Sequence, residues 1–166
     1  MQNGGANNYI EMILTAYTDA SYCDRTKIAV CGFSVYSEGR LIKNQLVIIE
    51  GFSHVGWAES SAISEALQYC FLQKGVTGIE LHTDQILARD KERRAALPKF
   101  REVNEVLDIC WDHKIFVNIH YVKSHQKGLL TTHEKRHGLL DQSCRTQLRK
   151  YLHENTNSKI ERWNRA

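Results

Sequence analysis

The chain contains 166 residues, of which 42% are hydrophobic and 25% charged, and its formal net charge is +3 at pH 7. This length is sufficient for about one domain with a sizeable buried core, and the composition is that of an ordinary globular protein. Because no run of about 18 or more apolar residues is present, a membrane-spanning helix is not expected.

The N-terminal segment and the cysteines both favour a cytoplasmic protein. The first residues, MQNGGANNY, are polar and lack the basic and apolar regions of a secretion signal, so residues 1–10 are expected to form a flexible tail. The five cysteines are widely spaced and form no C-x-x-C pair, which favours reduced, buried thiols over a disulfide framework. We expect a monomer that does not associate with membranes.

The charge is unevenly distributed along the chain. Residues 1–85 contain 5 Lys+Arg and 9 Asp+Glu, a net charge of −4, whereas residues 86–166 contain 17 and 10, a net charge of +7. A basic half beside an acidic half favours a polyanionic partner held near an acidic centre.

The predicted elements are strands first, and then helices and strands in alternation. Apolar segments predict three strands near residues 11–18, 28–36 and 41–50, and Ser-Glu-Gly-Arg at 37–40 is typical of a hairpin turn. The apolar spacing then predicts a helix over 56–73, a strand over 79–83, a helix over 85–94, a helix with Pro98 in its first turn, a strand over 115–122 and a helix over 137–153. This order predicts one mixed α/β domain over residues 11–153, followed by a polar C-terminal extension over 154–166.

Four carboxylates occupy positions that turn chemistry alone does not explain. Asp19 and Asp84 each follow Thr at the predicted end of an apolar strand, and Glu59 and Asp141 lie on the apolar stripes of their helices. A carboxylate directed towards a core is costly unless it is paired or bound to a metal. Taken singly, Asp141 is explained as a first-turn acid favoured by the helix dipole, and Glu59 as a residue at the edge of the stripe that reaches solvent. Together the four acids indicate an oxygen-ligand site for Mg²⁺ or Mn²⁺.

These residues resemble the ribonuclease HI (retroviral-type ribonuclease H) family. The similarity extends over roughly residues 11–152, and it rests on the motifs YTDAS (17–21), AESSAISEAL (58–67), LHTDQ (81–85), YVKSHQKG (121–128) and HGLLDQSCR (137–145). The resemblance implies an α/β, ribonuclease H-like fold, in which helices flank a five-stranded mixed sheet whose first three strands are antiparallel.

The resemblance also implies an activity and a set of site residues. Asp19, Glu59, Asp84 and Asp141 would hold two Mg²⁺ ions, with Mn²⁺ as a substitute, and His125 would move a proton or assist product release. The implied reaction is endonucleolytic hydrolysis of the RNA strand of RNA–DNA hybrids, leaving 3′-hydroxyl and 5′-phosphate ends. Contacts to the nucleic acid are expected from Ser21, Trp57, Lys123, Lys127, Arg145 and Arg149.

Three positions depart from the family pattern. Ala58 precedes Glu59 where the family commonly carries asparagine, Gln85 follows Asp84 where serine is usual, and His137 stands four residues before the last acid where asparagine is frequent. The missing asparagine leaves the substrate open. A nuclease acting on another substrate, such as a junction resolvase or a DNA-cleaving enzyme, and a catalytically silent nucleic-acid-binding module therefore remain alternatives.

The segment between His125 and Asp141 is longer than is usual in the family, and we interpret it as an extended loop that touches substrate. His133 and His137 are four residues apart and, with His125 and Cys144, they offer a zinc site as an alternative. Solvent-facing histidines at the start of a helix are the more common arrangement, and no complete ligand set is evident.

The three tryptophans could stack on nucleic acid. Trp57 lies next to the expected site and is the best candidate, whereas Trp111 is expected in the core, on the apolar side of its helix. Trp163 falls in the polar C-terminal extension.

Overall fold

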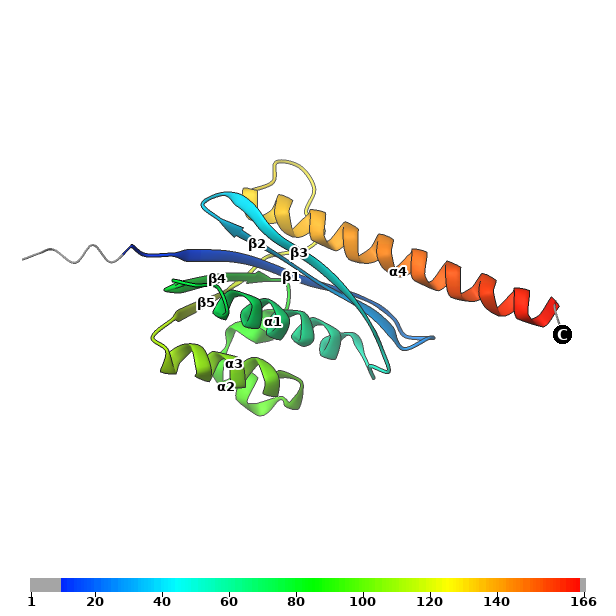
Figure 1. The fold of residues 1–166 in the computed structure, drawn as a ribbon, viewed down its shortest axis with the longest axis horizontal. Helices are drawn as coiled ribbons and strands as arrows, with labels where there is room; N and C mark the ends of the chain where they lie inside the picture. The colour runs from blue at the N-terminus through cyan, green and yellow to red at the C-terminus, as the bar shows by residue number, and fades with distance from the viewer. Residues whose placement is uncertain (1–9, 165–166) are drawn as a thin grey trace, which may run out of the picture.

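A computed structural model describes the backbone of residues 10–164 and the side chains of residues 10–155. Five strands form one sheet in the order β3-β2-β1-β4-β5 (Figure 1). The strands are β1 (Ile13–Cys23), β2 (Ile28–Ser37), β3 (Arg40–Glu50), β4 (Gly78–Thr83) and β5 (Phe116–Tyr121). The first three pair antiparallel, while β4 is parallel to both β1 and β5, so the predicted mixed sheet is confirmed.

The predicted hairpin between β2 and β3 is also confirmed. Glu38 and Gly39 form its two-residue turn, with φ angles of 49° and 77°. Two consecutive positive φ angles are the geometry that matches the twist of a tight hairpin, and glycine adopts it without steric cost.

Helices cover both faces of the sheet (Figure 1). One face carries α1 (Val55–Phe71), α2 (Lys91–Ala96) and α3 (Arg101–Asp112), with the short 3₁₀ turns η1 (Ile86–Arg89) and η2 (Pro98–Phe100) between them. The other face carries α4 (Thr132–Asn164) alone. Successive residues of a strand point to opposite faces, so Leu14 and Ala16 of β1 pack in the α1–α3 core while Tyr17 packs in the smaller core beneath α4.

Helix α4 approaches the sheet closely over Gly32 of β2. A Cβ atom built at Gly32 would lie 2.6 Å from the Sγ atom of Cys144 in α4 and 2.8 Å from the side chain of Leu46. Any residue larger than glycine would require these side chains or the helix to shift. Because Gly32 pairs with Asp19 across β1 and β2, the close approach brings α4 over the strand segment that carries the first acid.

The boundaries of two elements differ from those expected. Strand β1 extends to Cys23, so Asp19 lies within a strand and not at its end. Helix α4 begins at Thr132, so the segment from 126 to 140 is not one extended loop. A capping box explains this early start, because the backbone N–H of Glu134 donates to Oγ1 of Thr131 and the Thr131 N–H donates to Glu134 Oε1.

The expectation that Trp111 lies in the core is wrong, since its side chain is 80% exposed. Helix α3 buries Val103, Val106 and Cys110, and Trp111 is rotated by about 100° around the helix from its neighbour Cys110. The predicted helix over 85–94 is divided between η1 and α2.

At the ends of the chain, the predicted tail falls outside the described residues except for Ile10, and α4 continues through the predicted extension to Asn164. Trp163 lies beyond the described side chains. Among the described helices, none has the length and apolarity required to span a membrane.

Candidate active site

Asp19 and Asp84 are brought together by the parallel pairing of β1 and β4. The last residues of this pairing are Thr18 and Thr83, and Asp19 and Asp84 follow them directly in the chain. Strand β1 then continues beside β2 alone, whereas β4 ends. The two carboxylates therefore lie at the point where the sheet loses a strand, and the Asp19 side chain is only 5% exposed.

Helix α1 contributes Glu59, which is partly buried and held by Gln85. The Gln85 amide Nε2 donates to Oε2 of Glu59 at 2.5 Å. Burial, followed by the charge of Asp84, raises the pKa of Glu59 to about 7, despite the opposing hydrogen bond from Gln85. Gln85, noted in the sequence only as a departure from the family, thus connects the third acid to the segment that follows β4.

Helix α4 contributes Asp141, which is bound by Arg145 one turn later. The guanidinium donates from Nε to Oδ1 of Asp141 at 3.0 Å and from Nη2 to Oδ2 at 2.8 Å. The same Nη2 lies 2.8 Å from Nδ1 of His125, whose φ of 57° is in the left-handed region. Burial raises the pKa of Asp141, but the hydrogen bonds and charge of Arg145 outweigh it and hold that pKa below its ordinary value.

Asp19, Glu59 and Asp84 differ from Asp141 in having raised pKa values. Burial raises the pKa of Asp19 to about 9, and the nearby carboxylates of Asp84 and Asp141 add to the rise. Burial also raises the pKa of Asp84. Oδ2 of Asp19 and Oδ1 of Asp84 are buried without a hydrogen-bond partner. Carboxylate oxygens that are buried and unpartnered are costly, so this donor set fits a divalent cation.

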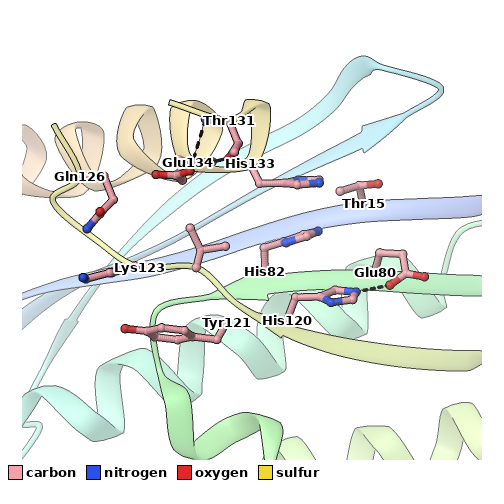
Figure 2. Close-up of a pocket in the computed structure, with 11 residues that line it drawn as sticks. Thr15, Glu80, His82, His120, Tyr121, Lys123, Gln126, Thr131, His133 and Glu134 are labelled. Atoms are coloured by element: carbon pink, nitrogen blue, oxygen red, sulfur yellow. Dashed lines mark hydrogen bonds and ion pairs between the residues drawn. The ribbon is translucent and has the colours of Figure 1, made fainter. Parts of the chain in front are cut away.

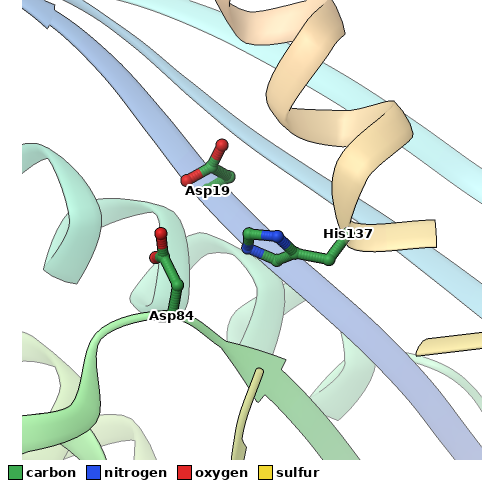
Figure 3. A group of neighbouring side chains, drawn as sticks. All are labelled: Asp19, Asp84 and His137. Atoms are coloured by element: carbon green, nitrogen blue, oxygen red, sulfur yellow. The ribbon is translucent and has the colours of Figure 1, made fainter. Parts of the chain in front are cut away.

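A group that the sequence did not assign to this cluster is His137. A nitrogen of its ring and one oxygen each from Asp19 and Asp84 all lie within 4.8 Å of one another (Figure 3). The sequence did contain a signal for this placement of His137, because a residue four positions before Asp141 lies on the same side of the helix.

A stack of aromatic rings fixes the first turns of α4 on the sheet. The His133 ring lies on the His82 ring with centroids 4.0 Å apart, and its Nδ1 is 2.6 Å from the Tyr17 hydroxyl. The guanidinium of Arg136 lies 3.9 Å above the ring of Tyr36. Figure 2 shows these histidines along an open pocket of about 720 Å³ between β4, β5 and the start of α4.

The alternative zinc site is not assembled by the described residues. His133 is directed at Tyr17, whereas His137 is directed at the aspartates. His125 is bound to Arg145, and Cys144 is buried against the sheet. The two histidines are one helical turn apart but do not converge.

Comparisons with known proteins identify the fold. No protein-family model and no curated protein matches the chain. The ribonuclease H1 of the halophilic archaeon Halobacterium salinarum NRC-1 is similar to it with a TM-score of 0.54 at 22% identity, over 66% of this chain and 85% of that one. The N-terminal ribonuclease H domain of rv2228c from Mycobacterium tuberculosis, solved as a fusion with maltose-binding protein, gives a TM-score of 0.55 at 14% identity, over 67% and 87%. The chain has the ribonuclease H-like fold.

In this ribonuclease H-like domain, four of the six residues expected to contact nucleic acid lie on elements that carry the acids, and the two lysines lie in the loop after β5. Ser21 follows Asp19 by two residues in β1, and Trp57, in the first turn of α1, is 37% exposed. Lys123 and Lys127 are exposed after β5, and Arg149 is exposed on α4. Arg145 is the exception, because its guanidinium is already bound to Asp141 and His125.

Proposed function

We propose that this chain is a metal-dependent nuclease that hydrolyses the RNA strand of RNA–DNA hybrids and leaves 3′-hydroxyl and 5′-phosphate ends. The observation that carries the proposal is the set of buried, unpartnered carboxylate oxygens on Asp19 and Asp84, with Glu59 and Asp141 beside them. The similarity in fold to two ribonucleases H supports it.

The four acids have distinct roles in this proposal. Asp19 is influenced by the charges of both Asp84 and Asp141, which suits a bridging ligand. Glu59 and Asp84 interact with each other and would serve one cation, and Asp141 would serve the second. When bound, divalent cations would supply a nucleophilic water and stabilise charge on the attacking and leaving oxygens of the phosphodiester.

The position of His125 and Lys123 near Asp141 supports a role for both in acting on the substrate. Together with Asp141 and His137, they line a small pocket of about 80 Å³ between α4 and the loop after β5. His125 is exposed and tied to Asp141 through Arg145. It would deliver a proton to the leaving oxygen or receive one from the product, and Lys123 would bind a backbone phosphate as a point charge.

A cleavage assay on four substrates tests the proposal. End-labelled RNA–DNA hybrid, double-stranded DNA, double-stranded RNA and a four-way junction of matched sequence are incubated with Mg²⁺ or Mn²⁺. We expect cleavage of the RNA strand of the hybrid, and its loss in Asp19→Asn but not in Asp108→Asn, an exposed carboxylate on α3.

Other outcomes would replace the proposal with a specific alternative. Cutting of the junction without cutting of the hybrid would indicate a resolvase. Binding of nucleic acid without cleavage of any substrate would indicate a silent binding module. Wild-type hybrid cleavage by Asp19→Asn would show that the metal-site assignment is wrong.

A further inference from the structure

His137 is a buried group beside Asp19 and Asp84 that the four expected acids do not include. Its side chain is 2% exposed, and its Nε2 atom has no hydrogen-bond partner. Oδ2 of Asp19 and Oδ1 of Asp84 also have none. Figure 3 shows the imidazole directed from α4 towards the two carboxylates of the sheet. If the histidine were simply an ion-pair partner of either aspartate, these atoms would be bonded to each other.

The tautomer of His137 leaves Nε2 free to act as a ligand. The His137 ring also interacts with the backbone of Thr18, and this interaction favours the protonated ring. A neutral ring that keeps its proton on Nδ1 leaves the lone pair on Nε2, the atom that has no hydrogen-bond partner. Histidines that bind metals usually donate their second ring N–H to a backbone carbonyl or a carboxylate, because that bond fixes the tautomer and the ring orientation.

The surroundings of His137 hold it in this position. His137 lies one helical turn before Asp141 and one turn after His133, which is bonded to Tyr17. Its neighbour Arg136 packs against Tyr36. The direction of the imidazole is therefore set by the docking of α4 on the sheet, as is required of a preorganised ligand.

The chemistry of an imidazole nitrogen restricts which cation the group selects. Mg²⁺ prefers an all-oxygen environment, whereas imidazole is a good ligand for first-row transition metals and carboxylates are good ligands for Mn²⁺. We propose that His137 supplies a nitrogen ligand to a cation held by Asp19 and Asp84, and that this ligand makes the site select Mn²⁺ over Mg²⁺. The inference rests on the proposed function only in using the same metal site.

Direct metal binding tests this inference without any nucleic acid. Calorimetric titrations of the metal-free protein with Mn²⁺ and with Mg²⁺ would be compared for the wild type, His137→Asn, and His113→Asn, an exposed histidine at the end of α3. We expect His137→Asn to weaken Mn²⁺ binding by at least about tenfold, since even substitutions outside the ligand shell have effects of this size. Mg²⁺ binding should change little, so the Mn²⁺/Mg²⁺ affinity ratio should fall, and His113→Asn should retain the wild-type ratio.

A spectroscopic measurement on the wild type keeps the test independent of how well the variant folds. Electron spin echo spectroscopy of bound Mn²⁺ should detect coupling to a directly bonded nitrogen, and this coupling should be absent in His137→Asn. An uncoupled wild-type spectrum, or an unchanged affinity ratio in a folded His137→Asn, would overturn the inference while leaving hybrid cleavage intact. Unchanged binding of both metals by Asp19→Asn would refute the site itself and the proposed function with it.

Discussion

Replacing Asp19 by asparagine should stabilise the metal-free protein while removing its response to divalent cations. Asparagine has nearly the same shape and supplies an N–H donor where the protonated carboxyl has its proton. The pKa of Asp19 is raised from 3.8 to about 9 by burial and by the neighbouring carboxylates. Between these values the folded state binds more protons than the unfolded state, so the stability of the metal-free wild type falls as pH rises from about 4 to about 9.

The size of the effect follows from the same pKa. At pH 7.5 the wild type has lost at most about 5 kcal/mol of the stability that it has below pH 4. Because side chains relax and water penetrates, we expect Asp19→Asn to gain about 1–3 kcal/mol at this pH. The gain should be near zero at pH 4 and increase with pH. Titration of the histidines beneath α4 also changes the stability with pH. It does so in both the wild type and Asp19→Asn, so its effect cancels in the difference between them.

Urea unfolding in EDTA, followed by circular dichroism at several pH values, measures this difference. Asp108→Asn is the control and should stay within about 0.5 kcal/mol of the wild type, as exposed substitutions do. With Mn²⁺ at about 100 times its dissociation constant, the wild type should gain about 2.7 kcal/mol and Asp19→Asn should gain little. If Asp19→Asn were no more stable than the wild type at pH 8 in EDTA, the idea of carboxylates destabilised by burial and mutual repulsion would be wrong.

Three further predictions test other contacts. Gln85→Leu should leave the fold intact but lower single-turnover hybrid cleavage by about tenfold. The reason is that Glu59 loses its only described hydrogen-bond donor from the segment after β4. Full activity would show that the contact is dispensable. Gly32→Ala should lose about 1–3 kcal/mol in urea unfolding through overpacking, whereas Gly138→Ala, which meets nothing within 4 Å in α4, should gain about 0.5–1 kcal/mol; equal effects would contradict the close approach of α4. Trp57→Ala should weaken binding of a fluorescent hybrid by about 1–3 kcal/mol if a base stacks on it, while Trp111→Ala, although more exposed, should bind as the wild type does.

The sequence predicted most of the elements and singled out the four acids because their signals are local. Strands β1 to β3 are apolar and separated by a recognisable turn, and Glu59 and Asp141 follow the apolar spacing of their own helices. Asp84 does lie directly after a strand. In contrast, Asp19 is inside β1, because the length of that strand depends on its long-range pairing with β2 and not on its own residues.

The remaining errors and omissions arise where the tertiary structure decides. Trp111 is apolar, but α3 buries the side that carries Val103, Val106 and Cys110 and exposes Trp111. The position of His137 beside Asp19 and Asp84 depends on how α4 packs on β1, which no spacing within the helix specifies. The start of α4 was more accessible, since Thr131 and Glu134 have the spacing of a capping box in the sequence.

The packing of α4 over β1 and β2 divides the candidate site between two layers, and this division has a consequence for the dynamics of the chain. Asp19 lies in β1 and Asp84 lies directly after β4, whereas His137 and Asp141 belong to a helix whose core contacts are few. A cation bound by both sets would add a link between two layers that the described residues otherwise connect through packing, the ring stack and a few hydrogen bonds, such as that between Tyr17 and His133. Amide hydrogen exchange in the first half of α4 should therefore slow markedly when the metal binds, while exchange in β2 and β3 should change much less. Metal occupancy would in this way control the opening of one helix and leave the rest of the domain unaffected.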